Sequence, residues 1–288
     1  MAADIKRWTI KNNWRSGVSI FFDWIFIFFI IYIAKVINSL VFDVVAIWLI
    51  GLKQYALGEV FVHEASHNNL FKNKKLNTQL QFLFAYPFLN SVEEYRKYHI
   101  PHHTSLGDTN VDPLCDIYKK HGLNKKNPNL FYIWFLRPLL GIYSYEFFMD
   151  KIHKKDWENY KYTLVVYGIV ICFLFFQGLL TDFLVYWAIP YVWCFPSFYC
   201  WQEIEDHYNA QEIARTNTGR IRNWMAHNTG YHFPHHMCPG IPWYNLPQAH
   251  VLFFSNSKDV TTGFFDTYQK IRRILPENKV NKICFDST

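Results

Sequence analysis

Residues 17–67 read GVSIFFDWIFIFFIIYIAKVINSLVFDVVAIWLIGLKQYALGEVFVHEASH. Two long apolar runs, 17–37 and 40–61, fill most of this stretch, and the pair Asn38 and Ser39 separates them. A helix needs roughly 20 apolar residues to cross a bilayer, and both runs reach that length. The stretch therefore predicts a hairpin of two transmembrane helices, with the histidines of HEASH directly after the second helix.

A second pair of apolar runs lies further along the chain, at 162–180 and 183–201, with a very short turn at 181–182 between them. Pro190 and Pro196 fall in the later run. Proline removes a helical hydrogen bond and clashes with the preceding turn, so this span is expected to be broken. The four runs predict an all-α integral membrane fold with four transmembrane helices in two hairpins.

The composition agrees with membrane spans joined to a water-facing part. Apolar residues make up 51% and charged residues only 18% of the 288 residues, whereas about 25% charged is usual for soluble proteins. The mean hydropathy is nevertheless close to zero, at -0.07. We therefore expect a single domain, 1–288, in which the polar segments 62–161 and 202–288 form a helical cap.

The distribution of charge orients this domain. Two hairpins place both termini and the cap on one side, which holds nearly every lysine and arginine. The positive-inside rule makes that side cytoplasmic. The four predicted spans make the protein multi-pass. A formal net charge of +6 is modest and diffuse, so it favours a basic rim at the membrane surface and gives no support for nucleic acid as a partner.

Charged residues within the second run need a protein environment. Asp43, Lys53 and Glu59 would be costly in contact with lipid, so they are expected to face the bundle interior or an interface. Two shorter apolar patches, 80–89 and 130–148, are interrupted by proline. They are too short to span and are expected to be interfacial or re-entrant.

Histidines cluster in four groups that the predicted topology brings to the cytoplasmic side. The groups are HEASH at 63–67, HIPHH at 99–103, a single histidine just after the fourth run, and HFPHH at 232–236. Side chains at i, i+3 and i+4 share one face of a helix. The groups together contain nine candidate metal ligands: His63, His67, His99, His102, His103, His207, His232, His235 and His236.

Nine imidazoles exceed what one ion can bind, so they predict a di-metal site. Imidazole suits zinc, copper, iron and nickel, so the ligand type alone does not choose the metal. The remaining histidines are interpreted as structural or surface residues: His121, His153, His227 and His250. Pro101 and Pro234 lie inside two of the groups and predict that each begins at a helix start or a turn.

Acidic neighbours are candidates to orient these rings by hydrogen bonding, without binding metal themselves. They are Glu64, Glu205, Asp206 and Asp112. Glu64 lies between two histidines of one helix and should point elsewhere around it. For Asp112 an ordinary solvated acid is an equal alternative.

The three histidine motifs resemble the boxes of the membrane fatty-acid desaturase superfamily, and the resemblance extends from the first span to about His250. The stretch YHFPHHMCPGIPWYNLPQAH (231–250) is similar to bacterial acyl-lipid desaturases and also to carotenoid ketolases, and EDHYNAQEIARTNTGRIRNW (205–224) resembles the preceding linker of those desaturases. The resemblance implies two iron ions held by the box histidines, with His207 completing the set.

The resemblance also implies a reaction in which the irons, two electrons and O2 remove hydrogen from an unactivated C–H bond. A fatty-acyl or related lipid that enters from the bilayer is the expected substrate. Desaturation is expected, but a lipid or carotenoid hydroxylase or ketolase shares the same motifs. The chain has no haem-binding segment like that of cytochrome b5 and no cysteine cluster for iron–sulfur, so a separate electron donor of ferredoxin or cytochrome b5 type is expected.

HEASH also fits H-E-x-x-H, in which two histidines bind zinc and the glutamate acts as general base. A zinc intramembrane protease is therefore a remote alternative. It would leave the other histidine groups without a role. It would also need a later aspartate ligand inside a span, and the runs after HEASH contain none.

Overall fold

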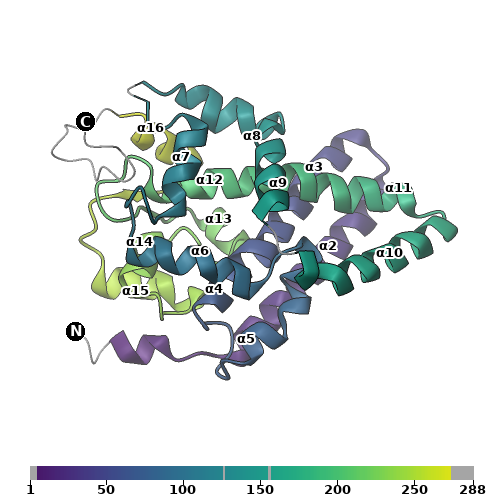
Figure 1. Ribbon diagram of the computed structural model, residues 1–288, viewed down its shortest axis with the longest axis horizontal. Coiled ribbons are helices and arrows are strands. Elements are labelled where there is room, and N and C mark those ends of the chain that lie inside the picture. Colours follow the sequence, from purple (N-terminus) through teal and green to yellow (C-terminus); the bar gives the residue numbers. More distant parts are fainter. Residues whose placement is uncertain (1–4, 126, 155–156, 274–288) are drawn as a thin grey trace.

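The computed structural model describes residues 5–125, 127–154 and 157–273, and nearly all of its regular structure is helical (Figure 1). Within this part of the chain, three continuous helices are long and apolar enough to cross a membrane. They are Asn13–Ile37, Leu40–Ser66 and Leu180–His207.

The three long helices consist of named elements joined end to end. The first is α2 (Asn13–Ile37). The second comprises α3 (Leu40–Tyr55), a π-helical turn (Ala56–Phe61) and α4 (Val62–Ser66). The third comprises α11 (Leu180–Phe183), π-helical turns at Leu184–Ala188 and Pro190–Cys194, and α12 (Phe195–His207).

Shorter elements make up the rest of the described chain. The helices are α5 (Leu76–Gln79), α6 (Val92–Thr104), α7 (Pro113–His121), α8 (Arg137–Leu139), α9 (Ile142–Lys154), α10 (Lys161–Phe176), α13 (Arg220–Met225), α14 (His232–Met237), α15 (Leu246–Phe253) and α16 (Phe264–Ile271). A π-helical turn spans Tyr132–Leu136, and 3-10 turns lie at Arg7–Thr9, Gln81–Leu83, Tyr86–Phe88, Trp157–Tyr160 and Trp243–Asn245. Strands β1 (Thr216–Asn217) and β2 (Val260–Thr261) pair in parallel.

The expected spans 17–37 and 40–61 lie inside the first two long helices. The run 162–180 instead forms α10, which has 16 residues. At 1.5 Å per residue, α10 is about 24 Å long, which is less than the roughly 30 Å of a hydrocarbon core. No residue of α10 is buried. The described structure thus contains three helices of membrane-spanning length, and α10 is a fourth, shorter apolar helix.

Both hairpin turns lie at one end of the molecule (Figure 1). Asn38 ends α2 in the left-handed region, with φ 48°, and its N–H donates to Ala34 O at 2.9 Å. The expected turn at Thr181 and Asp182 is wrong, because both residues belong to α11. The chain turns earlier, at Gly178 with φ 69°, since glycine alone adopts that backbone without strain.

Pro190 and Pro196 do not break the third long helix, contrary to expectation. The helix continues through two π-helical turns, Leu184–Ala188 and Pro190–Cys194. Wider π turns absorb the missing hydrogen bond and the steric demand of a proline ring without ending the helix. The Ser197 hydroxyl also donates to Trp193 O at 2.8 Å.

The charged residues of the second run face protein, as expected. Lys53 Nζ lies 2.7 Å from Asp23 Oδ1, and it donates to Met225 O at 2.8 Å. His227 Nε2 lies 2.6 Å from the other oxygen of Asp23. Asp43 accepts a hydrogen bond of 2.6 Å from the Tyr186 hydroxyl. These contacts supply the partners that charged groups need away from water.

Close packing joins the long helices. A Cβ at Gly51 would lie only 2.3 Å from Cys194 Cβ, so glycine is required where α3 crosses the third long helix. Trp24 stacks on Trp187 with ring centroids 5.7 Å apart, and Phe88 stacks on Trp187 at 5.5 Å. The spans therefore form one rigid bundle that can hold the histidines at its end.

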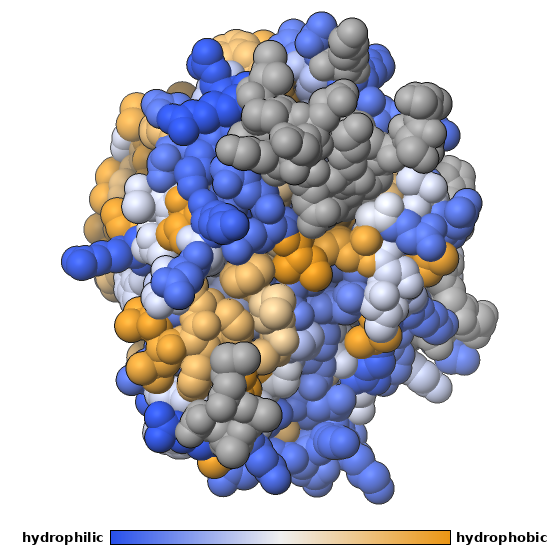
Figure 2. Space-filling view, turned by 90° about the vertical axis from the view of Figure 1, so that its left-hand side faces the viewer, coloured by the Kyte–Doolittle hydropathy of each residue, from blue (hydrophilic) through white to orange (hydrophobic). Residues whose placement is uncertain are grey.

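The end of the molecule opposite the hairpin turns is largely polar. Figure 2 looks onto this end, where hydrophilic side chains surround smaller apolar patches. A buried ion pair ties its segments together, because Arg215 Nε lies 2.9 Å from Asp259 Oδ1 and both side chains are about 1% exposed.

Candidate metal centre

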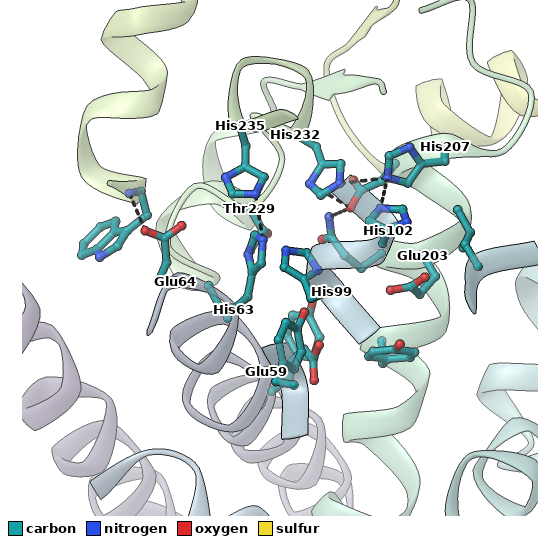
Figure 3. Close-up of a pocket in the computed structure, with 18 of the residues that line it drawn as sticks. Glu59, His63, Glu64, His99, His102, Glu203, His207, Thr229, His232 and His235 are labelled. Atoms are coloured by element: carbon teal, nitrogen blue, oxygen red, sulfur yellow. Dashed lines mark hydrogen bonds and ion pairs between the residues drawn. The ribbon is translucent and has the colours of Figure 1, made fainter. Parts of the chain in front are cut away.

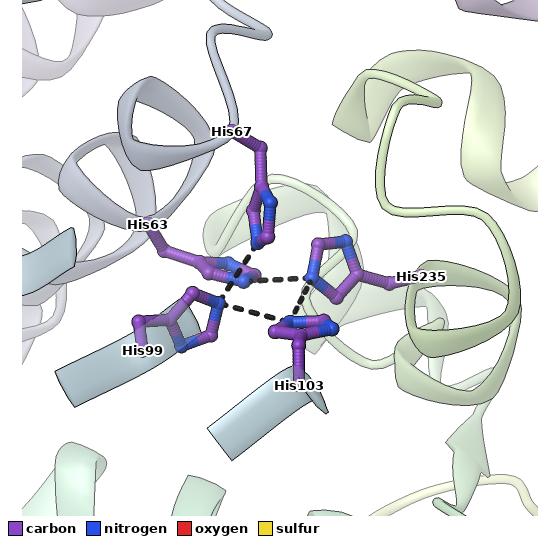
Figure 4. A group of neighbouring side chains, drawn as sticks. All are labelled: His63, His67, His99, His103 and His235. Atoms are coloured by element: carbon purple, nitrogen blue, oxygen red, sulfur yellow. Dashed lines mark hydrogen bonds between the residues drawn. The ribbon is translucent and has the colours of Figure 1, made fainter. Parts of the chain in front are cut away.

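The nine predicted histidines converge into two neighbouring sets. The first set has five members: His63, His67, His99, His103 and His235 (Figure 4). The second has four members: His102, His207, His232 and His236. Within each set the ring nitrogens lie within 4.8 Å of one another. Each set draws its members from segments that are far apart in the sequence.

The HEASH motif ends the second long helix, directly after a π-helical turn. π turns inside α-helices occur mostly at functional sites, because they redirect the side chains that follow. Arg96 of α6 caps the end of this helix: its Nε donates to Ser66 O at 2.9 Å, and its Nη2 donates to Ala65 O at 3.3 Å. These bonds fix the first motif against the helix that carries the second.

HIPHH lies within α6, so the expectation of a helix start or turn at Pro101 is wrong. The helix begins at Val92, after Ser91 accepts a hydrogen bond from Glu94 N at 3.1 Å, and it continues through the proline to Thr104. The lost hydrogen bond of one proline is outweighed here by packing of α6 against α4.

Helix α6 divides its histidines between the two sets. His99 and His103, four residues apart, both reach the first set, whereas His102 joins the second. The expectation for Pro234 is confirmed, because it stands in the first turn of α14. That helix also contributes to both sets, with His235 in the first.

His207 is the last residue of α12 and is only 2% exposed. Its Nε2 lies 3.2 Å from His102 Nε2 and 3.0 Å from His232 Nε2. The structure therefore places it among the box histidines and not on an exposed linker.

The spacing of the ring nitrogens fits metal ions. In the first set, Nε2 of His63 and Nε2 of His235 are 2.8 Å apart. In the second set, His236 Nε2 and His232 Nε2 are 3.0 Å apart. Two nitrogens bound to one ion at about 2.1 Å and at right angles would be about 3.0 Å apart. The two sets therefore have the spacing of ligands around a common ion.

Hydrogen bonds at the opposite ring nitrogens strengthen this argument. His102 Nδ1 lies 3.0 Å from Asp112 Oδ1, and His207 Nδ1 lies 2.9 Å from Ile213 O. Both oxygens only accept, so each Nδ1 carries the proton of its neutral ring. The two Nε2 lone pairs then face each other at 3.2 Å. Lone pairs so close repel unless a cation lies between them.

Burial keeps the rings in the neutral form that binds metal. It lowers the pKa of His67 to about 4. Burial, together with the neighbouring histidines, also lowers the pKa of His99, His232 and His235 well below the usual range. A ligand that is already deprotonated need not release a proton when a metal binds.

Two of the four candidate acids reach a histidine. Asp112 is 3% exposed and accepts from His102, so it is not a solvated acid. Asp206 Oδ2 lies 3.3 Å from His232 Nδ1. Carboxylates in such positions fix ring orientation and raise ligand basicity.

The other two acids have different partners. Glu64 accepts a hydrogen bond from Trp243 N at 3.0 Å and so points away from the rings (Figure 3). Glu205 Oε1 lies 2.6 Å from Arg222 Nη1. Glu64 therefore contacts backbone and Glu205 an arginine side chain, and neither is seen to orient a described histidine, which is a correction to the sequence-based expectation.

A cavity of about 80 Å³ lies against both histidine sets (Figure 3). Besides histidines, it is lined by Glu59, Glu203, Tyr95 and Tyr98. Glu59 was expected to face the bundle interior or an interface, whereas no role was expected for the other three. The signal that identifies them is their spacing, because each residue precedes a candidate ligand by four positions and so shares its helix face.

The remaining histidines lie outside both sets. His121 Nδ1 lies 2.7 Å from Arg137 Nη1, and the His227 ring stacks on Phe61. His250 lies beside Tyr231, with ring centroids 5.7 Å apart. The side chain of His153 lies outside the described residues. The three described ones are structural, as expected.

Fold and site together define a helical membrane protein with a candidate two-metal centre built from histidines. The chain belongs to the fatty acid desaturase family, whose sequence profile matches residues 38–267.

Three named relatives are similar to the chain. Dihydrorhizobitoxine desaturase of Bradyrhizobium elkanii is 28% identical over 233 residues, covering 71% of this chain and 65% of its own length. The sn-1 oleoyl-lipid 12-desaturase of Arthrospira platensis is 22% identical, over 65% of this chain and 61% of its own. Sphingolipid delta(4)-desaturase DES1 of Drosophila melanogaster is 26% identical, over 76% and 68%. The chain thus spans less than two thirds of the length of the first two relatives.

Proposed function

We propose that the chain is an O2-dependent di-iron oxidoreductase that desaturates the alkyl chain of a fatty-acyl or related lipid. The observation that carries the proposal is the convergence of nine histidine rings into two sets, within each of which the ring nitrogens lie within 4.8 Å of one another. Membership of the fatty acid desaturase family supports iron over the other metals that imidazole accepts.

The chain's own residues would prepare the site for this reaction. The five histidines of the first set and the four of the second would each hold one iron ion. Bound iron supplies the redox chemistry with O2 and two electrons that breaks an unactivated C–H bond. Asp112 and Asp206 hold the rings of His102 and His232 in orientation. The cavity beside the rings would receive the reacting carbon atoms of the substrate.

Two features favour desaturation over the rival reactions. The three relatives described above are all named as desaturases, which supports dehydrogenation over hydroxylation or ketolation. A zinc protease would need Glu64 near a bound water, but Glu64 accepts from Trp243 N instead. His63 and His67 also share their set with three further histidines, more than such a site uses.

We further propose four membrane crossings with the histidine-bearing end in the cytoplasm. Helix α10 would be the fourth crossing, because it is apolar and buries no residue against the protein. The lysine and arginine bias supports the orientation. A separate donor of ferredoxin or cytochrome b5 type would deliver electrons at that end.

The test is metal analysis and product analysis on the chain in lipid nanodiscs. We expect two irons per chain, O2 consumption that depends on a reducing partner, and a lipid product that has lost two hydrogens. A single ion per chain at full occupancy would contradict the di-metal site. A product that has gained oxygen, seen by mass spectrometry, would indicate the hydroxylase alternative.

A further inference from the structure

A basic patch surrounds the start of α2, the first long apolar helix. It consists of five side chains from two segments of the chain: Lys11, Arg15, Lys72, Lys74 and Lys75. Residues 5–22 and 68–91, which contain the patch, hold seven lysines and arginines and no aspartate or glutamate. The whole chain has 29 basic and 23 acidic residues, so its net positive charge is concentrated in these two segments.

Contacts between the two segments bring their charges together. The Lys72 N–H donates to Asn13 Oδ1 at 2.8 Å. Burial lowers the pKa of Lys11, the Glu64 carboxyl raises it, and the Lys74 ammonium lowers it again, so the two lysines are neighbours. Like charges repel at such range, and an anion between them would relieve the repulsion.

The protein itself supplies little negative charge to the patch. Lys11 Nζ donates to Gly240 O at 3.2 Å, and the Arg15 guanidinium lies over the Tyr244 ring, 5.0 Å from its centroid. These contacts orient two cations without neutralising them. Glu64 is the acid nearest to Lys11 in this account, but it is only 2% exposed and does not reach the surface where a ligand would bind.

The three lysines of the turn 72–75 are exposed, and no salt bridge joins them to an acid in the part of the chain that the structure describes. A buried asparagine, Asn77, holds this turn in place. Its Oδ1 accepts from Leu70 N at 3.1 Å and from Phe71 N at 3.2 Å, and its Nδ2 donates to Lys74 O at 3.2 Å. The lysines therefore project from an ordered turn beside α2.

Exposed apolar side chains connect the patch to the outer surface of α2. Trp14, next to Arg15 in the first turn of the helix, is 78% exposed. Phe21 and Phe22, further along α2, are exposed as well. Tryptophan concentrates at membrane–water interfaces, and basic residues beside a span attract anionic headgroups. This continuity favours a lipid over an acidic protein, which would not cover an apolar helix.

We propose that the basic patch binds the phosphate of an anionic phospholipid, whose acyl chains lie along the exposed apolar face of α2. Charge complementarity selects the headgroup, and the apolar helix surface receives the chains. The proposal depends neither on the metal centre nor on the reaction.

Native mass spectrometry on the full chain in detergent measures this binding lipid by lipid. The probes are dioleoylphosphatidylglycerol and dioleoylphosphatidylcholine, which have the same acyl chains but differ in net charge. We expect phosphatidylglycerol to bind at least about 10-fold more tightly. The triple variant Lys72→Gln/Lys74→Gln/Lys75→Gln should weaken its binding by about 100-fold, since each lysine near a lipid surface contributes about 5-fold. Binding of phosphatidylcholine should not change.

A second triple variant, Lys119→Gln/Lys125→Gln/Lys258→Gln, is the matched control. Its three lysines are exposed and lie outside the two segments, so the net charge falls equally while the patch is kept. Figure 1 shows α7, which carries Lys119, far from α5. The control should retain the preference for phosphatidylglycerol, and thermal unfolding of both variants should match that of the unaltered chain.

Three results would overturn the proposal. Equal affinity for the two lipids would show that the patch does not select an anionic headgroup. Equal loss of affinity in both triple variants would show that only net charge matters. Binding of poly-L-glutamate that needs the three patch lysines, without any preference between the lipids, would identify the patch as an interface for an acidic protein.

Discussion

His207 contributes to the site through both ring nitrogens. Its Nδ1 donates to Ile213 O, and its Nε2 faces His102 and His232. One backbone carbonyl thereby selects the tautomer in which the metal-facing nitrogen is free of a proton. The single histidine outside the three motifs is thus held in orientation by a hydrogen bond to the backbone.

Replacement of His207 by alanine should remove one of the four nitrogens of the second set. We expect the chain to retain about one iron instead of two, and to lose nearly all activity. If the ring only orients a neighbour, metal affinity should fall by about 10- to 100-fold. Metal analysis by mass spectrometry on the purified variant measures this.

His250→Ala is the control for that variant, because His250 lies outside both sets and its ring contacts Tyr231. It should bind as much iron as the unaltered chain. Normal iron content and normal turnover in His207→Ala would show that the second set does not need this ring.

At the scale of elements, a buried charge cluster joins the first two spans to the segment before the third histidine motif. Asp23 of α2 contacts Lys53 of α3 and His227, which precedes α14. All three side chains are less than 10% exposed. Removing the Asp23 carboxylate would leave the Lys53 ammonium buried without a compensating charge.

We therefore expect Asp23→Ala to lower the free energy of unfolding by about 3–5 kcal/mol, since Lys53 would remain charged in an apolar setting. Thermal unfolding in a mild detergent, compared across variants, measures the effect. Lys35→Ala is the control, because its pair with Asp182 is exposed and should contribute at most about 1 kcal/mol. Equal effects of the two substitutions would contradict the proposed role of the buried cluster.

Gly51 lies where α3 closely approaches the third long helix. Gly51→Ala would force a methyl group against Cys194 Cβ, where only 2.3 Å is available. Overpacking of this kind costs about 1–3 kcal/mol, so the midpoint of thermal unfolding should fall. In Gly168→Ala the new Cβ meets nothing within 4 Å, and we expect stability to be unchanged or slightly raised, because alanine favours a helix. A stable Gly51→Ala protein would show that the helices can separate at little cost.

At the scale of the whole molecule, the hairpin turns and the histidine-bearing elements occupy opposite ends (Figure 1). Lys35 of the first hairpin contacts Asp182 of the second at 2.6 Å, which confirms that the turns are neighbours. This arrangement gives the proposed topology a direct consequence. A label that cannot cross the membrane should reach the two ends from opposite sides.

Single cysteines at Gln177 and Lys258 test this topology in a chain whose exposed Cys172 is first replaced by serine. We expect an impermeant maleimide to label Gln177→Cys from outside intact cells and Lys258→Cys only after the cytoplasmic face is opened. Both positions are exposed, lie outside the helices and have no positive φ, so neither substitution should disturb a helix. Labelling of Gln177→Cys from the cytoplasmic side would contradict four crossings with the histidines in the cytoplasm.

The all-helical membrane class and the nine candidate histidines could be predicted from the amino-acid sequence. Apolar length and histidine spacing are local properties, and each follows from helix geometry alone. The division of those histidines into sets of five and four is seen only in the folded chain, because it depends on how α6 and α14 are placed relative to the other histidine-bearing segments. It also decided that Asp112 and Asp206 contact rings while Glu64 and Glu205 do not.

The expectation that proline breaks or begins a helix failed where tertiary packing outweighed the local preference. Pro101, Pro190 and Pro196 remain inside continuous helices, since neighbouring elements and π turns accommodate them. That Glu59 and Glu203 line one cavity was beyond sequence reasoning for a similar reason. They are 144 positions apart in the chain, and only the meeting of two long helices brings them to one cavity. Spacing fixes which face a side chain occupies, but the partner across that face is a property of the folded chain.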